Sequence, residues 1–549
     1  MIVYIIAPRD GFKLPKSALV LGRKDHTIGP AGGYCPRRFS HNIASVSPVH
    51  SNRIFRCALL AVLALILATG LMTLDYPLYG DQALFMVGVQ KLDSVGLLYK
   101  DFWDLKPPGI FYFYRAGAML FGSTERGLHL FELLFHLFGA VAIACTLKKH
   151  GGHPLLGPLA ALLSVWVYYA VGQINMMTQL EGLVYPFLLL AAVFFGEAAD
   201  AGGARWLALA GASSGVLFWS KPVLILIPAG FGLLYLLKTR TLRRMWPLAA
   251  GFSLMTVAML APFYSEGTLR EALWTCLIYP GRYVTELTRQ PLRLLLESTG
   301  WWVVNEQAWI AAAMLPLWAV LRGREKRLLP RMMAVWLVLA AVIIVVQTRS
   351  WWSYHFLLLF APVGILASFG LVSLTSRMKL HPAVAIAAFL VLLTPALAKL
   401  RGKTAGWSLK VLAGDAASIR RFQQVQSPLY GAVERDLARF GPPVRQMVCA
   451  GDPVVIFRAN AKQAVPLQSW SPENYVDQQW ADLADQWEAH APSTIVLTPE
   501  YAGLVLSRSP RIAKLLESRY TLAVEGETGS WYRRLDAVAV KDERTPGGS

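Results

Sequence analysis

Charged and aromatic residues are mixed in one stretch, residues 80–114, which reads GDQALFMVGVQKLDSVGLLYKDFWDLKPPGIFYFY. Asp81 stands near its beginning, directly after Gly80, and Lys106 stands near its end, directly before two prolines. A carboxylate of this kind offers acid or base chemistry. The two prolines favour an extended segment followed by a helix over residues 109–122. Lys106 would then lie beside a helix N-terminus, where a cation and free N–H groups can bind an anion.

Each of these two residues also has a plain structural interpretation. Asp81 can cap a helix over residues 81–90, and Lys106 can be an interfacial lysine whose side chain reaches out of the membrane. The surrounding aromatic residues are typical of a segment that lies along lipid headgroups. Function therefore has to be argued from the elements that hold both residues.

Apolar segments of nearly bilayer-spanning length recur from residue 54 to residue 400. We predict about eleven spans, at residues 54–74, 128–147, 155–171, 180–195, 206–219, 223–237, 246–264, 302–321, 332–347, 354–373 and 383–399. Every strongly basic short loop between them falls on one side, which by the positive-inside rule is the cytoplasm. The N-terminus is then cytoplasmic, and the stretch 80–114 lies on the outer side.

Composition supports lipid as the solvent for much of the chain. Hydrophobic residues make up 55% and charged residues only 16%, whereas a soluble protein carries about a quarter charged residues. The net charge of +19 is explained by basic cytoplasmic loops and anionic lipid headgroups, so we expect no nucleic-acid partner. None of the asparagines begins an Asn-x-Ser/Thr acceptor, which favours a bacterial chain.

Two further segments flank the apolar region. Residues 1–50 are polar and interrupted by glycine and proline, and we expect a disordered cytoplasmic tail. Residues 401–549 are charged and hold no spanning segment, which predicts a small α/β domain on the outer face. Its predicted elements are strands at 444–450 and 494–497, a helix at 511–518 and a closing hairpin or pair of strands at 520–534. The predicted fold class is a mainly α polytopic membrane protein with a C-terminal α/β domain.

Other polar residues inside apolar segments are candidates for function, because an ionisable group in a bilayer costs free energy. Glu181 begins a predicted span on its outer side, and either orients a substrate or pairs with a neighbouring helix. His129, Glu132 and His136 share one face of a span; a hydrogen-bonded interior cluster is favoured there over a metal site. Residues 279–283 (YPGRY) form either a mobile lid or, as we favour, an ordinary connecting turn.

The order of these features resembles a known superfamily. An acidic residue after the first span, an aromatic stretch ending in Lys-Pro-Pro and a Phe/Tyr-rich helix are similar to the GT-C glycosyltransferases that use polyprenyl-phosphate sugars. The nearest branch comprises lipid A aminoarabinose transferases, lipopolysaccharide core galacturonosyltransferases and protein O-mannosyltransferases. Three further motifs fit the resemblance: 178–185 (TQLEGLVY), 219–222 (WSKP) and 349–362 (RSWWSYHFLLLFAP).

The resemblance implies roles for individual residues. Asp81 would be the catalytic base that takes the proton from the acceptor hydroxyl. The donor phosphate would be bound by Lys106, Arg349, His355 and Lys221, and the substrates would also meet Asp101, Asp104, Glu181 and Tyr354. Many members have Asp-Glu where this chain has Asp81-Gln82, so a divalent metal stays open and no other cofactor is implied.

The implied function is transfer of a sugar from a polyprenyl phosphate, with inversion, to a glycolipid or polysaccharide on the periplasmic side of a bacterial inner membrane. Transfer to protein Ser/Thr is the alternative within the enzyme class. A transporter or flippase of lipid-linked sugars is the alternative from another class, although no internal repeat supports it. A scaffold protein would need neither Asp81 nor Lys106.

Overall fold

The computed structural model describes residues 48–93, 96–286, 290–348, 350–378, 381–441, 444–467, 470 and 472–536. The chain divides into a unit of residues 1–52 and a unit of residues 53–549. The predicted disordered tail lies outside the described residues up to position 47, and so does Arg349.

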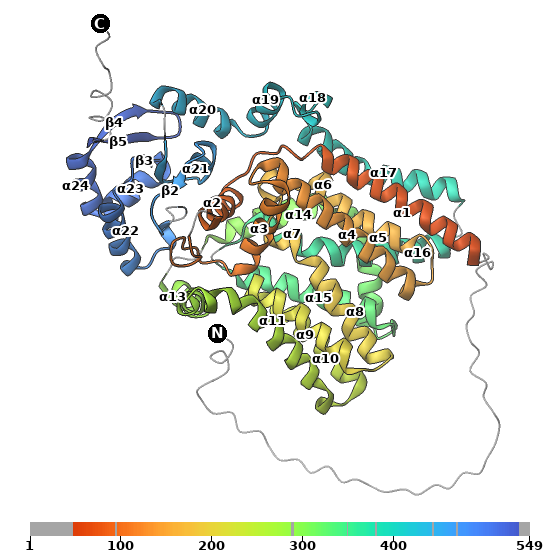
Figure 1. Ribbon diagram of the computed structural model, residues 1–549. Coiled ribbons are helices and arrows are strands. Elements are labelled where there is room, and N and C mark those ends of the chain that lie inside the picture. The colour runs from red at the N-terminus through yellow and green to blue at the C-terminus, as the bar shows by residue number, and fades with distance from the viewer. Residues whose placement is uncertain are drawn as a thin grey trace, which may run out of the picture. The chain divides into compact units, whose positions relative to one another are not determined.

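Apolar helices make up most of the second unit (Figure 1). Among the described residues, eight helical segments are long and apolar enough to cross a membrane. They are α1 (Pro48–Leu71), α4 (Glu125–Gly151), α7 and α8 (Leu180–Leu183, Tyr185–Asp200), η3 and α10 (Pro222–Ile225, Leu226–Thr239), η4 and α11 (Leu242–Met245, Trp246–Ser265), α14 (Leu292–Leu321), α15 (Leu328–Val346), and η6 and α16 (Ser353–Leu359, Phe360–Met378). The chain is a multi-pass membrane protein.

The three other predicted spans also coincide with helices. Residues 155–171 contain α5 (Leu156–Ala161), η1 (Leu162–Trp166) and α6 (Val167–Val171), residues 206–219 lie in α9 (Ala204–Ser220), and residues 383–399 lie in α17 (Pro382–Lys403). Each of the eleven predicted spans is therefore helical, although only eight meet the requirements of length and apolarity in the part of the chain that is described.

Helix α16 lies at the centre of the helical bundle. In the most apolar 18-residue stretch of its segment, 78% of the residues are buried, against 11% in the corresponding stretch of the α11 segment. Small residues allow its neighbours to approach closely. A Cβ atom at Gly370 would lie 1.9 Å from the carbonyl oxygen of Ala312 in α14, and one at Gly364 would lie 2.5 Å from Oγ of Ser164 in η1.

Two shorter helices lie between α1 and α4 and carry the ends of the charged stretch. Helix α2 (Asp81–Asp93) begins at the acidic residue, and α3 (Pro108–Phe121) begins directly after Pro107, whose backbone is extended. The predicted helix at 109–122 is thus confirmed to within a residue at each end. Lys106 stands two residues before the first residue of α3.

The C-terminal part forms a five-stranded mixed sheet with the order β2-β1-β3-β5-β4. The strands are β1 (Gln446–Ala450), β2 (Lys462–Gln463), β3 (Thr494–Leu497), β4 (Tyr520–Glu525) and β5 (Ser530–Arg534). Strands β2, β1 and β3 are parallel, whereas β5 is antiparallel to both β3 and β4. All three strand predictions are confirmed, and the predicted helix at 511–518 is α24 (Pro510–Arg519).

Further helices connect and flank these strands. They are α18 (Leu409–Leu412), α19 (Ala416–Gln426), α20 (Pro428–Phe440), α21 (Val454–Arg458), α22 (Asp477–His490) and α23 (Pro499–Arg508). Helices α22, α23 and α24 lie close to the sheet, all in blue in Figure 1. The central strands are largely buried, with all four residues of β3 and four of the five residues of β1 buried, whereas four of the six residues of β4 are exposed.

The C-terminal sheet is bound to the charged stretch through several hydrogen bonds. The Tyr430 hydroxyl accepts from the Leu78 amide at 2.7 Å. Lys91 donates to the Gln463 carbonyl at 3.0 Å, and the Trp103 amide donates to the Pro466 carbonyl at 2.9 Å. Helix α2 packs against α21 and β2. The stretch 80–114 is therefore held between the apolar helices and the C-terminal sheet.

Candidate active site

Asp81 and Lys106, the two ends of the charged stretch, meet in space. Lys106 Nζ lies 3.2 Å from Oδ1 of Asp81, and both side chains are only partly exposed. The same oxygen accepts a hydrogen bond from Nε1 of Trp470 at 3.1 Å. The Lys106 ammonium also lies 5.2 Å from the centre of the Phe85 ring. A carboxylate and a cation thus stand side by side in a setting that excludes much of the water.

The backbone explains why Asp81 is available for chemistry. Helix α2 begins at Asp81, so Gly80 takes the position that precedes the helix. Gly80 has a φ of 49°, a conformation that glycine adopts without strain. The Asp81 carboxylate is turned to Lys106 and Trp470. The interpretation of Asp81 as a helix cap therefore gives way to a side chain that belongs to a charged cluster.

The two other acidic residues of the stretch differ in their surroundings. Asp104 is almost fully buried, its Oδ2 lies 3.8 Å from Lys106 Nζ, and its Oδ1 accepts from the Leu105 amide. Burial raises the pKa of Asp104 above its ordinary value, and the charge of Lys106 only partly offsets this. Asp101 instead accepts from the Leu97 amide at 2.8 Å and closes a local turn. Of the two, Asp104 is the one that the structure brings to Lys106.

Gln82 has a bonding role that a glutamate could not fill. Its Nε2 donates to the carbonyl oxygens of Ile174 and Met177 at 2.9 and 2.5 Å, and its Oε1 accepts from the Tyr79 amide at 3.0 Å. A carboxylate has no proton for those two carbonyls. Among the described residues, no group of three or more His, Cys, Asp and Glu side chains is arranged to hold a metal ion. The side chains described around Asp81 therefore do not form a set of ligands that fits a divalent metal ion.

A second cluster joins three predicted site residues from separate helices. Lys221, which precedes η3, lies 2.6 Å from Oε1 of Glu181 in α7, and Nε2 of His355 in η6 lies 3.5 Å from the same oxygen. Glu181 and His355 are buried. Tyr354 packs edge-on against the His355 ring, with the ring centres 4.5 Å apart. Glu181 thus makes the ion pair with a neighbouring helix that the sequence left open.

The two clusters are electrostatic neighbours. His355 feels the charges of Lys221 and Glu181 and also that of Asp81. The predicted residues Asp81, Lys106, Asp104, Glu181, Lys221 and His355 therefore fall into one charged region made of two carboxylate–lysine pairs. Arg349 lies outside the described residues.

The predicted interior cluster on α4 is a hydrogen-bonded network. Glu132 accepts from the Thr178 amide at 2.6 Å, from the Tyr168 hydroxyl and from Nδ1 of His129 at 3.0 Å. Nε2 of His136 lies 3.8 Å from Glu132. Thr178 has a φ of 53°, an unusual conformation that these bonds hold. Because this loop also receives the Gln82 amide, the network supports the backbone next to Asp81.

Residues 279–283 lie in a helix and do not form the connecting turn that we favoured from the sequence. Helix α13 (Tyr279–Glu286) covers this segment. The buried Tyr279 donates from its hydroxyl to Oε1 of Gln479 in α22 at 2.8 Å, and its ring packs edge-on against Trp103. The favoured turn was wrong because the C-terminal domain supplies a hydrogen-bond partner that the local sequence does not reveal.

Two residues near Asp81 were missed in the sequence analysis. Trp470 comes from a loop without a recognisable motif, so nothing in the sequence singles it out. Asp452 follows strand β1, accepts a hydrogen bond from the Val454 amide, and lies close enough to Gly80 and Asp81 for both to act on its ionisation. A signal for Asp452 was present, since functional side chains tend to follow the carboxyl ends of parallel strands.

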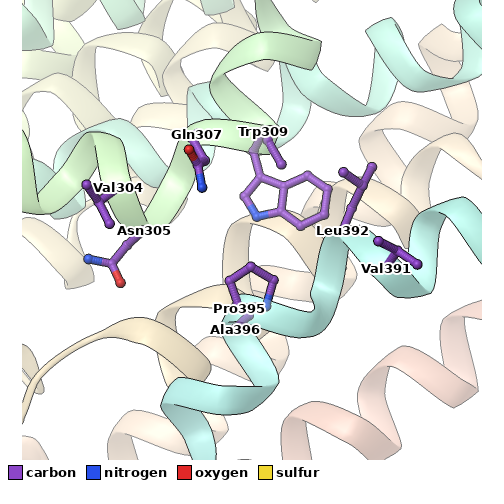
Figure 2. A pocket seen from close by; sticks show the side chains of 9 residues that line it. Val304, Asn305, Gln307, Trp309, Val391, Leu392, Pro395 and Ala396 are labelled. Atoms are coloured by element: carbon purple, nitrogen blue, oxygen red, sulfur yellow. The ribbon is translucent and has the colours of Figure 1, made fainter.

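A cavity between α14 and α17 lies away from these residues. It has a volume of about 330 Å³. Figure 2 shows Trp309, Leu392 and Pro395 around it, with the amides of Asn305 and Gln307 on one side. None of the predicted site residues lines this cavity.

Comparison with known proteins connects this geometry to a fold. Residues 105–265 match the family model described as dolichyl-phosphate-mannose-protein mannosyltransferase. ArnT from Cupriavidus metallidurans bound to undecaprenyl phosphate superposes with a TM-score of 0.57 over 86% of this chain and 97% of that chain, at 16% identity. The chain has a GT-C glycosyltransferase fold.

Other comparisons agree with this fold. ArnT in the apo state gives a TM-score of 0.55 at 16% identity, covering 87% of this chain and 98% of that chain. No curated protein sequence matches the chain. The family match begins at residue 105, just before Lys106, and extends through Glu181 and Lys221. The GT-C fold thus holds both carboxylate–lysine pairs, and the predicted resemblance is confirmed.

Proposed function

We propose that the chain transfers a sugar from a polyprenyl-phosphate carrier to a hydroxyl acceptor at the periplasmic face of a bacterial inner membrane. The observation that carries this proposal is the contact between Asp81 and Lys106, 3.2 Å apart, at the starts of α2 and α3. The GT-C fold and the family match from residue 105 support it.

Asp81 is the base in the proposed reaction. Its carboxylate takes the proton of the acceptor hydroxyl while that oxygen forms a bond to the anomeric carbon. The bond from that carbon to the phosphate oxygen breaks at the same time, and the phosphate keeps the electron pair. Attack from the face opposite the phosphate inverts the configuration of the sugar.

Lys106 stabilises the leaving phosphate. Negative charge grows on the phosphate as the bond breaks, and a preorganised cation lowers the energy of that state. Lys106 is shared between Asp81 and Asp104 before the donor binds. When Asp81 gains its proton it releases its share of the lysine, so the lysine charge becomes available to the phosphate in the same step.

The second pair, Glu181 with Lys221, has a different proposed role. Lys221 is already neutralised by a carboxylate at 2.6 Å, so it gives little net positive charge to a phosphate. We assign Glu181, Lys221 and His355 to the wall of the sugar site, where hydroxyl groups can bond to them. Tyr354, which packs on His355, belongs to the same wall, and Arg349 keeps the donor-phosphate role that the sequence resemblance implies.

The placement of the chain in the membrane is part of the proposal. Residues 1–50 face the cytoplasm, residues 51–400 form the transmembrane catalytic domain, and residues 401–549 form a periplasmic domain. The basic loops that set this orientation follow α4, α10, α14 and α16, or precede α1, and in the proposed topology they share one side. The acceptor is a glycolipid or polysaccharide, and Ser/Thr of a protein is the alternative.

One assay separates these possibilities. Purified protein in detergent is incubated with radiolabelled undecaprenyl-phosphate sugars and a panel of lipid, polysaccharide and protein acceptors. Transfer that is abolished in Asp81→Asn supports the proposal, and the anomeric configuration of the product, read by NMR, tests inversion. Movement of lipid-linked sugar across vesicles without any transfer would instead establish a flippase.

A further inference from the structure

The C-terminal domain presents the carboxyl ends of its parallel strands to the start of α2. Strand β1 leads through α21 to β2 on one side, and β3 leads to β4 and β5 on the other. Connections that leave neighbouring strands in opposite directions open a crevice at their carboxyl ends, where open α/β sheets carry functional side chains. Asp452 follows β1 and Glu500 follows β3 at this edge.

Asp452 lies beside the backbone that leads to the proposed base. Its Oδ1 accepts from the Val454 amide at 3.0 Å, at the start of α21, and the Gly80 amide and the Asp81 charge both act on its carboxylate. A carboxylate of the C-terminal domain thus stands next to the peptide directly before Asp81. A Cβ atom at Gly80 would lie 3.0 Å from the Trp470 ring, which would have to shift by a few tenths of an ångström to admit it.

Trp470 is bonded to the base itself. Its indole N–H donates to Oδ1 of Asp81, the oxygen that also receives Lys106. Two donors on one oxygen fix the rotation of the carboxylate and direct the other oxygen, Oδ2, to the acceptor proton. An indole donor keeps its geometry without adding a charge, so it orients the carboxylate and leaves its negative charge in place.

We propose that Asp452 and Trp470 are positioning residues through which the C-terminal domain holds Asp81 in its reactive orientation. Transfer would then require the docked C-terminal domain, although neither residue touches the reacting atoms. The inference rests on the proposed function, because it assigns the positioning of the same base.

Ionisation of Asp452 makes this arrangement sensitive to pH. Withdrawal from water raises the pKa of Asp452 to about 6, and the negative charges of Asp81 and Glu500 add to the shift. The Tyr79 hydroxyl and the Cys449 thiol are the other titratable groups in its electrostatic field. Above this pH the ionised Asp452 strengthens its bond to the Val454 amide, attracts the nearby Gly80 amide and repels the Asp81 charge, so proton uptake by Asp81 becomes more favourable.

Three variants and one control test this inference with the full chain in detergent. Trp470→Phe removes the indole N–H and keeps a ring, Asp452→Asn keeps an acceptor and loses the ionisation, and Asp452→Ala removes the acceptor. Asp477→Asn is the control, since Asp477 is a fully exposed acid of the same domain. Thermal unfolding establishes that each variant is folded.

Two readouts are measured. Transfer from labelled undecaprenyl-phosphate sugar is followed between pH 5 and pH 8, and hydrogen–deuterium exchange is followed in the peptide that contains Gly80. We expect Trp470→Phe to lower kcat roughly tenfold, as for a lost bond to a charged group, with the donor KM within about twofold. Asp452→Asn should remove an inflection near pH 6 from the kcat profile, and Asp452→Ala should speed exchange at Gly80 roughly tenfold.

The outcomes separate this inference from the proposed function. If Asp81→Asn is inactive while Trp470→Phe and Asp452→Asn keep the wild-type kcat and pH profile, the positioning role is wrong and the function stands. If the wild type transfers no sugar from any donor, the function is wrong, and exchange at Gly80 decides whether Asp452 holds this backbone. Unchanged hydrogen–deuterium exchange at Gly80 in Asp452→Ala would show that Asp452 does not hold this backbone.

Discussion

The two carboxylate–lysine pairs differ in how completely the surrounding protein closes around them. Asp81 and Lys106 are partly exposed, 3.2 Å apart, and come from the segment between α1 and α4, where Trp470 of the C-terminal domain contacts Asp81. Glu181 and Lys221 are 2.6 Å apart, and the glutamate is buried in the helical bundle. A pair with a longer contact and a partly exposed carboxylate can exchange partners with a substrate, whereas a short pair with a buried carboxylate is costly to open. From this difference we assign the catalytic chemistry to the first pair and mainly the stabilisation of the site to the second.

The largest expected effect comes from removing the base. Asp81→Asn should lower kcat by roughly a hundredfold to ten-thousandfold, because general-base catalysis supplies that much of the rate. The matched control is Asp93→Asn, at the other end of α2, where an exposed carboxylate lies 3.5 Å from Arg115. Equal rates for the two variants in a sugar-transfer assay would contradict the assignment of the base.

Removing the cation of the same pair should have the next effect. Lys106→Ala should lower kcat by roughly tenfold to a hundredfold, since one charge-assisted bond to the leaving phosphate is lost. Lys106→Arg keeps the charge and should recover part of the rate. Lys100→Ala, at an exposed lysine of the same stretch, is the control. If Lys106→Ala keeps both donor affinity and turnover, Lys106 is not at the phosphate site.

Substitutions in the second pair should lower the stability of the protein more than its rate of sugar transfer. Lys221→Met leaves the Glu181 carboxylate buried without its partner, at a cost of about 3 kcal/mol in unfolding free energy. Combining it with Glu181→Gln should restore much of the loss. Denaturation in detergent measures both variants. A rate loss as large as that of Asp81→Asn, with unchanged stability, would move the chemistry to the second pair.

The smallest expected effect concerns Asp104, the acid beside Lys106. Burial raises the pKa of Asp104, so the folded state favours the protonated form, and stability falls as pH rises from the ordinary value near 3.8 through the raised one. Asp104→Asn should flatten this fall and be slightly more stable than wild type at pH 7. Unfolding temperatures recorded from pH 4 to pH 8 test it, and a variant less stable than wild type at pH 7 would show that pairing with Lys106 outweighs burial.

Local patterns in the sequence predicted most of the fold. The spans follow from runs of apolar residues, and the strands at 494–497 and 520–534 follow from short apolar segments bounded by polar ones. The start of α3 follows from two prolines, which fix backbone angles without any help from tertiary contacts. These elements depend on neighbours in the sequence, so the sequence was sufficient.

The site was predicted less completely because its contacts join distant segments. Asp81 and Lys106 were chosen from the sequence and do meet in space, but Trp470 lies 389 positions after Asp81 and no local pattern points to it. The helix at 279–286 likewise depends on Gln479. The hydrogen bonds of Gln82 to two carbonyls could not be foreseen, since the loop of Ile174 and Met177 has no regular structure beyond one short turn.

The most direct test of the account is a single-turnover measurement that compares the two pairs. Asp81→Asn and Glu181→Gln are each loaded with labelled undecaprenyl-phosphate sugar, donor binding is measured, and one round of transfer is followed. The account predicts that Asp81→Asn binds donor like wild type and transfers at least roughly a hundredfold more slowly, while Glu181→Gln keeps a transfer rate within about tenfold of wild type. Wild-type transfer by Asp81→Asn, or loss of transfer confined to Glu181→Gln, would contradict it.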